Sequence, residues 1–247
     1  MKRFCLVGLV LVLMIGICSC NPTPDSDPSS DSRSSSDASE VEYMTTPCSK
    51  EGVAAFCDIL GELQGNGLFA GYILSEENCF NVTPQKVKEE TNYKIFKFSD
   101  SCASFVMIDN EVYTLCEWFG GYGFVNAVPC DFDNDGNKDL LVASSWGSGL
   151  HRSIISIFNS VTKESTVIYD TSTTNDPQTD LIVRISSPSF APDASFDPPV
   201  YYEVCSVRTE PGDNSASLSY LLTGIAGSVS VRDGVIAFTP FASEENL

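Results

Sequence analysis

Basic residues and histidine are scarce in this sequence. Its 247 residues include 14 Lys and Arg against 33 Asp and Glu, with one histidine, so the formal net charge is −19. Binding to nucleic acid requires Lys and Arg to neutralise phosphates, so this balance argues against nucleic acid as a partner. It favours a soluble extracytoplasmic domain that attracts cations.

A C-x-x-C pair is also missing. Seven cysteines follow the N-terminal segment, at positions 48, 57, 79, 102, 116, 130 and 205. Neither a zinc knuckle nor a thioredoxin-type redox pair is therefore supported. In an oxidising compartment some of the cysteines would pair, but one sequence does not reveal the connectivity. The odd number leaves at least one thiol unpaired in a monomer, and a buried thiol packs as a small apolar group.

No apolar run is long enough for a permanent membrane helix. The run from Phe4 to Ile17 falls short of the about 20 apolar residues that such a helix needs. Since Lys2 and Arg3 precede it, it predicts a secretory signal. An ordinary cleaved signal with incidental cysteines is one interpretation. The other depends on "ICSC", residues 17–20.

This "ICSC" stretch resembles the lipobox of bacterial lipoproteins, with Ile17 and Ser19 at the aliphatic and small positions. The resemblance implies a signal peptide over 1–19 and lipidation of Cys20, which becomes the first mature residue. It also implies a lipid-anchored, extracytoplasmic protein of the bacterial cell envelope, at the outer membrane or cell surface. Asn21 follows instead of Asp, so no inner-membrane retention signal is visible.

Residues 20–45 contain mostly Ser, Asp and Pro and have little to bury. Such a segment does not offset its ordering entropy, so we expect a disordered tether, with a recognition tail as the alternative. Residues 46–247 are enough for a single globular domain with a real core.

One helix is expected at the start of this domain. The apolar residues of "TTPCSKEGVAAFCDILGELQGNG" recur at helical spacing and predict an amphipathic helix over 46–64. Thr46 resembles an N-cap before the first-turn proline Pro47, and Gly65 ends the helix.

Short β-rich runs separated by turn residues fill the region 68–240. Asp109-Asn110 and Asp233-Gly234 each join two such runs and predict two-residue hairpins. We therefore expect a mainly β (α+β) fold, an antiparallel β sandwich or bent sheet with one N-terminal amphipathic helix.

The segment "CDFDNDGNKDLLV" places oxygen-bearing side chains at every second position. These are Asp131, Asp133, Asp135, Asn137 and Asp139. A loop of this kind turns alternate residues inward, and calcium takes six to eight oxygen ligands. Gly136 permits the sharp turn, and at the position of Asn137 the usual donor is the main-chain carbonyl in place of the side chain. The spacing predicts a calcium site in preference to magnesium, and an ion-free acidic turn is the alternative.

The aspartate loop is not an EF-hand, because Val142 stands where the bidentate Glu would be and the flanks are strand-like. It resembles the calcium loop of FG-GAP and VCBS-type repeats, D-x-D-x-D-G-x-x-D-L, through Leu140. That resemblance implies a structural calcium ion between two strands and a surface binding or adhesion role. The motif occurs once, so a full propeller is not expected.

Aromatic and basic residues flank the loop in sequence. Trp118, Tyr122 and Trp146 either belong to the core or form a platform for a sugar or peptide. His151 or Arg152 either braces the loop or contributes to that surface. No G-x-S-x-G elbow accompanies Ser148, so a catalytic set is not recognisable.

These features predict a lipid-anchored calcium-binding module that binds an unknown protein or glycan at the surface. A small calcium-dependent extracellular hydrolase, acting on glycans, is the alternative. A redox-sensing envelope protein is a third hypothesis, from the odd number of cysteines.

Overall fold

A computed structural model describes residues 43–71, 73–116, 120–133, 135–147, 152–173, 180–185, 202–212, 216–232 and 235–241. All of them belong to one compact unit, Glu40–Leu247. The predicted signal peptide, Cys20 and most of the predicted tether lie outside these residues. The last three tether residues, Tyr43–Thr45, form strand β1, so the folded unit begins before residue 46.

The fold class agrees with the prediction from sequence. The described part is mainly β, with three antiparallel sheets and no closed propeller. The first sheet contains β2 (Cys79–Asn81), β3 (Lys94–Phe98), β4 (Ser104–Ile108) and β5 (Glu111–Cys116). The second contains β6 (Gly123–Cys130), β7 (Asp139–Trp146), β8 (Arg152–Phe158) and β9 (Ser165–Asp170).

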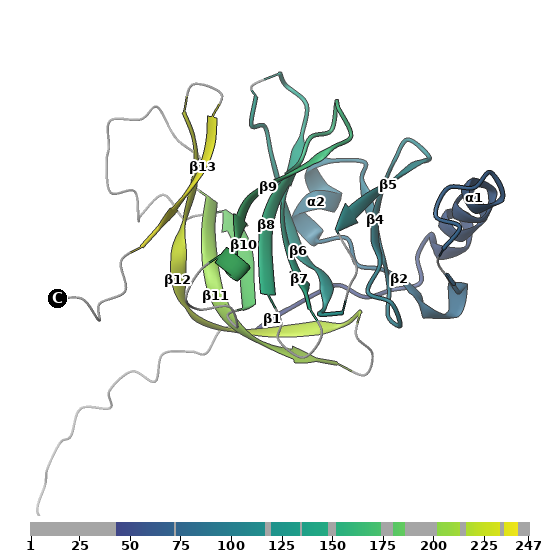
Figure 1. Cartoon of the computed structure of the whole chain (residues 1–247), viewed down its shortest axis with the longest axis horizontal. Coiled ribbons are helices and arrows are strands. Elements are labelled where there is room, and N and C mark those ends of the chain that lie inside the picture. The colour runs from purple at the N-terminus through teal and green to yellow at the C-terminus, as the bar shows by residue number, and fades with distance from the viewer. Residues whose placement is uncertain are drawn as a thin grey trace, which may run out of the picture. The chain divides into compact units, whose positions relative to one another are not determined.

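The third sheet is the most curved. Its strand order is β1-β12-β11-β10, and β13 pairs with a different part of β12 from the part that pairs with β1. The remaining strands are β10 (Asp180–Ile185), β11 (Tyr202–Pro211), β12 (Leu218–Arg232) and β13 (Val235–Pro240). The pairing of β11 with β12 shifts register between Val204 and Cys205 and between Ser206 and Val207. Because such bulges bend a strand, both strands curve strongly (Figure 1).

Both predicted hairpins are present. Asp109 and Asn110 have φ values of 50° and 68°, the left-handed pair that a type I′ turn between β4 and β5 requires. In the second hairpin β12 pairs with β13 up to Arg232 opposite Val235. The two turn residues between them lie outside the described residues.

The predicted N-terminal helix starts later than expected. Helix α1 spans Val53–Gly65, and its N-cap is Gly52 with φ 73°, not Thr46. The backbone N–H of Thr46 donates to Leu218 O at 2.8 Å, and its hydroxyl is hydrogen-bonded to the hydroxyl of Tyr220. The stretch between Pro47 and α1 is not helical: Ser49 forms an isolated bridge with Asn81, and a turn at 51–52 leads into the helix. Gly65 ends the helix as predicted.

A second, shorter α-helix and two 3₁₀ segments were not predicted. Helix α2 covers Gln85–Glu90 directly after Pro84. The 3₁₀ segments η1 and η2 cover Glu76–Asn78 and Thr171–Thr173. Among the described residues, no helix is both long and apolar enough to span a membrane.

The sheets and α1 stack in layers, and the second sheet is in the middle (Figure 1). Alternate residues of its strands face opposite sides. Phe124 and Leu140 pack toward the first sheet, whereas Val125 and Leu141 pack toward the third. On the far side of the first sheet, Phe56 of α1 stacks on Phe96, with ring centroids 4.1 Å apart.

Candidate metal site at the end of the central hairpin

The aspartate loop connects β6 to β7, the two strands of the buried central hairpin. Cys130 pairs with Asp139 at the base of the loop, so residues 131–138 project beyond the last paired residues. The strand context that the sequence predicted is therefore present. Asn134, in the middle of the loop, lies outside the described residues.

Three carboxylates converge in this loop. Asp131, Asp133 and Asp135 can each offer an oxygen such that these atoms all lie within 4.8 Å of one another. Gly136 has φ 86°, a left-handed conformation that a side chain would strain, and its position lets the chain turn sharply. The group has the composition and spacing to hold a metal ion.

Backbone N–H groups of the loop hold the carboxylates in place. Gly136 N–H donates to Asp131 Oδ2 at 3.2 Å, and Asp135 N–H donates to Asp133 Oδ1 at 3.3 Å. The side-chain amide and backbone N–H of Asn137 donate to the two oxygens of Asp135 at 2.9 and 2.7 Å. These bonds hold the pKa of Asp135 below its usual value and keep it ionised.

Among the three carboxylates, Asp131 provides the observation that most directly favours a bound cation. Its Oδ1 is buried and accepts no hydrogen bond, although its Oδ2 accepts the Gly136 N–H. A buried carboxylate oxygen without a partner is costly, and a cation between the three aspartates would satisfy it. The donor set, oxygen atoms from carboxylates, fits a hard divalent cation.

Asp139 has a supporting place in the structure. It is 1% exposed, its Oδ1 accepts the Ser160 N–H at 2.8 Å, and its Oδ2 accepts the Phe132 N–H at 3.4 Å. Burial raises the pKa of Asp139, and the two N–H donors oppose that rise. Asp139 thus connects the loop base to the turn after β8. Ligation by Asp139 and by Asn137 stays a prediction. It is compatible with the hydrogen bonds described here, because a carboxylate or carbonyl oxygen has further lone pairs.

The sequence did not point to the residues that support the loop from neighbouring elements. Asn159, in the turn after β8, donates from Nδ2 to Asp133 Oδ2 at 3.1 Å. Leu140 pairs with Phe158, so Asn159 and Ser160 come beside the loop base through strand register alone. Asp139 follows Lys138, whose carbonyl accepts the hydroxyl of Tyr93.

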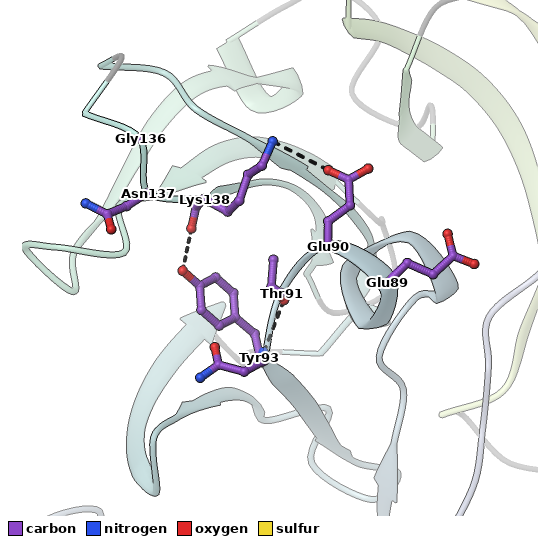
Figure 2. Close-up of a pocket in the computed structure, with 8 residues that line it drawn as sticks. Glu89, Glu90, Thr91, Tyr93, Gly136, Asn137 and Lys138 are labelled. Atoms are coloured by element: carbon purple, nitrogen blue, oxygen red, sulfur yellow. Dashed lines mark hydrogen bonds and ion pairs between the residues drawn. The ribbon is translucent and has the colours of Figure 1, made fainter.

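A polar hollow of about 470 Å³ lies on the α2 side of the loop. Its lining comes from residues 89–93 and 136–138 (Figure 2). Lys138 Nζ lies 3.5 Å from Glu90 Oε2, and Lys86 Nζ lies 3.1 Å from Glu90 Oε1. Glu89 Oε1 accepts the side-chain amide of Gln85 at 2.9 Å. Both glutamates of this hollow are therefore engaged in contacts along α2 or with the loop.

The predicted aromatic and basic neighbours of the loop lie elsewhere. Trp146 and Arg152 face each other at the end of β7 opposite Asp139, and the Arg152 guanidinium is 5.2 Å from the Trp146 ring centroid. Tyr122 precedes β6, also at the far end, and packs against the core. An extended strand of this length spans over about 20 Å, so these three residues do not support the loop. Trp118 and His151 lie outside the described residues.

A lysine is buried at that far end of β6. Lys97 of β3 is 0% exposed, and its Nζ donates to Phe124 O at 3.2 Å. Burial lowers the pKa of Lys97 to about 8, and nearby Cys102, Cys116 and Cys48 oppose this. Alternation along β3 puts Lys97 on the same side as Ile95, which packs in the core shared with the second sheet.

Comparisons with protein-family models, with curated proteins and with solved structures found no match for this chain. The site is therefore interpreted from its own geometry.

Proposed function

We propose that this protein is a lipid-anchored, extracytoplasmic module that binds one structural calcium ion and acts in binding at the cell surface. The observation that carries the calcium part is the convergence of Asp131, Asp133 and Asp135 around a buried, unpartnered oxygen of Asp131. The lipidation of Cys20 and the surface role rest on the lipobox and on the resemblance of the loop to FG-GAP and VCBS-type calcium loops.

Charge balance supports a bound cation. Asp131, Asp133 and Asp135 repel one another at this spacing, and N–H donors satisfy only part of their oxygens. The one lysine in the loop, Lys138, lies within ion-pair distance of Glu90 outside it. An ion of charge +2 at the centre of the three carboxylates would replace this repulsion with attraction.

Calcium is the preferred ion for geometric reasons. Magnesium demands near-octahedral geometry and keeps several waters, whereas calcium accepts irregular sets of six to eight oxygens. The loop offers three carboxylates, and the resemblance to FG-GAP and VCBS-type calcium loops implies further oxygens from Asn137 and Asp139. Part of the carboxylate group is exposed, so waters would complete the shell.

The proposed role of the ion is structural. The loop is hydrogen-bonded to the turn after β8 through Asn159 and, through Tyr93, to the segment just before β3. An ion that binds only the folded state stabilises it in proportion to the logarithm of ion concentration over Kd. At an ion concentration 100-fold above Kd the gain is about 2.7 kcal/mol, or roughly 5–10 °C in Tm for a domain of this size.

The experiment is a calcium titration followed by calorimetry and thermal unfolding. We expect saturable calcium binding and a rise in Tm over the chelator-treated protein, with a smaller effect of magnesium. A triple variant, Asp131→Asn, Asp133→Asn and Asp135→Asn, should lose both. A control with the same change in charge, Asp58→Asn, Glu62→Gln and Glu164→Gln, uses exposed acids outside the loop and should keep both. Identical melting curves with and without calcium would refute the proposal.

The anchor is tested separately. Metabolic labelling with a fatty acid in a bacterial host should label the wild type, and Cys20→Ser should remove the label. Label that persists in Cys20→Ser, or no label in the wild type, would contradict lipidation at this residue.

The calcium-dependent hydrolase has less support. A glycosidase requires two carboxylates facing a substrate across an open cleft. In the hollow beside the loop, Glu90 is paired with lysines and Glu89 with Gln85. In Figure 2 the carboxylates of Glu89 and Glu90 point away from Tyr93 rather than toward a shared centre.

A further inference from the structure

Two cysteines from different elements are in contact at the edge of the molecule that carries α1. Cys57 lies on α1, and Cys79 is the first residue of β2. Cys79 belongs to the buried apolar cluster under α1 and Cys57 packs against the same cluster, so the two thiols lie close enough to affect each other's acidity. Cys79 is 0% exposed, and Cys57 is half-buried. The pair therefore has one protected sulfur and one that solvent can reach.

The position of the pair follows from the packing of α1. Phe56 and Leu60 of α1 are buried against the first sheet, and Phe56 stacks on Phe96. Asn81 of β2 is opposite Phe96 in that sheet, so β2 borders the strand on which the helix rests. Figure 1 shows α1 beside β2, away from the central sheet. The thiol of Cys57 is thus held beside the thiol of Cys79.

Other thiols of the described residues have different partners. Cys102 Sγ donates to Gly121 O at 3.3 Å, Cys116 is hydrogen-bonded to the Ser144 side chain, and Cys130 is hydrogen-bonded to the backbone of Leu141. Cys205 belongs to the core between the second and third sheets. The contact between Cys57 and Cys79 is a thiol–thiol contact within the α1 layer.

Helix α1 has weak local stabilisation, so a covalent link there would matter. Its N-cap, Gly52, provides no side-chain hydrogen bond, its first turn has no acidic residue, and its last turn has no basic residue. Gly61 lies inside it and Gly65 ends it. Since such a helix depends on docking for its stability, a bond from Cys57 to β2 would hold it in its docked position.

We propose that Cys57 and Cys79 form a disulfide that ties α1 to β2 when the chain meets a disulfide-bearing oxidant. The Cys57 thiol gives up its proton and its sulfur attacks one sulfur of the oxidant's disulfide, from which the other sulfur leaves as a thiolate. Cys79, after losing its proton, attacks Cys57 Sγ in this mixed disulfide and releases the second thiol of the oxidant. Two protein thiols are oxidised to one disulfide, and one disulfide of the oxidant is reduced to two thiols.

The low acidity of the two thiols favours a disulfide that forms slowly and is stable once formed. Burial raises the pKa of Cys79 and that of Cys57, and Lys50 opposes the rise in both. The Lys50 ammonium donates to Cys79 O at 2.8 Å. High thiol pKa values favour the disulfide over the thiolate at equilibrium, so the bond is structural rather than a rapid redox relay. The predicted export signal would take the chain to a compartment where such bonds persist.

The sequence makes this disulfide easy to map. Between Lys50 and Lys86 there is no Lys or Arg, so trypsin releases residues 51–86 as one peptide, and Cys57 and Cys79 are its two cysteines. The purified protein is incubated with oxidised and reduced glutathione, then denatured and alkylated before digestion. We expect this peptide at a mass two hydrogens below the dithiol form, without alkylation. A second cleavage after Glu62, Glu76 or Glu77 should yield two fragments that separate only on reduction.

Each other mapping result overturns the proposal. Two alkyl groups on the peptide show that the thiols stay free, glutathione adducts show that they do not reach each other, and a link to another cysteine shows a different pairing.

Thermal unfolding tests the Cys57–Cys79 bond in a way that does not depend on whether one variant folds. Oxidation should raise the Tm of the wild type by roughly 5–10 °C, since the bond closes a loop of residues 57–79. The double variant Cys57→Ser/Cys79→Ser should lose this difference, and Cys48→Ser, which removes a half-buried thiol outside the pair, should keep it. An equal redox shift in the double variant would contradict the proposed bond.

Discussion

The charged groups at the two ends of strand β6 have opposite sign and opposite exposure to solvent. At one end, acidic side chains reach toward solvent in the loop that follows Cys130. At the other, the ammonium of Lys97 is fully buried and donates to Phe124 O. The exposed end can recruit a cation from solution, whereas the buried end must satisfy its cation from within. Charge near this strand thus has the composition for a metal site at one end and is a stability penalty at the other.

The two ends of β6 also differ in how closely other atoms surround the backbone. Gly123 has φ 62°, and a Cβ there would lie 2.1 Å from Cys102 O. Gly136 has φ 86°, but a Cβ there would meet no atom within 4 Å. Both glycines are required by backbone conformation, but only the first is also required by space.

The largest expected effect comes from this pair of glycines. Gly123→Ala combines left-handed strain with a backbone clash, and we expect a loss of roughly 3–5 kcal/mol in the free energy of unfolding. Gly136→Ala should lose about 1–2 kcal/mol from strain alone. Urea unfolding of both variants with chelator present measures the difference. Equal losses would remove the distinction between the crowded and the open end.

Next in size is the pH dependence introduced by Lys97. Its pKa in the folded protein is about 8, lowered from 10.5. Below pH 8 both states bind the proton, and the folded state bears the penalty. Between pH 8 and 10.5 the unfolded state binds more protons than the folded state, so stability rises with pH.

Lys97→Met should remove this dependence. The free energy of unfolding of Lys97→Met minus that of the wild type should fall by roughly 3 kcal/mol between pH 7 and pH 10.5. Thiol titration affects both proteins alike and largely cancels in this difference. A difference that does not change with pH would show that the ammonium is not penalised by its surroundings.

At the acidic end, Asp139→Asn tests support of the loop base without calcium. The amide keeps one acceptor and turns an NH₂ group toward Ser160 N–H or Phe132 N–H. We expect a loss of about 2 kcal/mol in chelator. Asp135→Asn, at an exposed position in the same loop, is the control and should lose far less. Equal losses would mean that Asp139 acts only through charge.

The smallest expected effect is at the surface of the same end. Glu90→Gln removes the ion pairs with Lys138 and Lys86, and half-exposed pairs of this kind contribute about 0.2–1 kcal/mol. The loss should shrink further in high salt. Glu89→Gln removes a neighbouring charge that pairs with neither lysine and serves as the reference. A loss of several kcal/mol would assign the hollow beside the loop a larger role.

The sequence predicted local features better than assembled ones. Hairpin chemistry at Asp109-Asn110 and the spacing of the three aspartates depend on neighbouring residues, so both were readable. The start of α1 was not, since Thr46 is held by Leu218 and Tyr220, which are distant in sequence. The same holds for Asn159 and its contact with Asp133, which only strand register brings together.

The position of Trp146 depends on the length of its strand. Trp146 is close to the loop in sequence, but an extended strand takes it away from Asp139. Proximity in sequence is a poor guide along a strand, where each residue adds about 3.3 Å.

Strand β1 also determines how the domain would bear force. Tyr43–Thr45 lies antiparallel to β12, and the next residue, Thr46, is hydrogen-bonded to Leu218 and Tyr220. Any pull on the N-terminal segment must enter the domain through this three-residue strand and be passed to the C-terminal half of the chain. A protein tethered by its N-terminus would thus take mechanical load first on its most curved sheet.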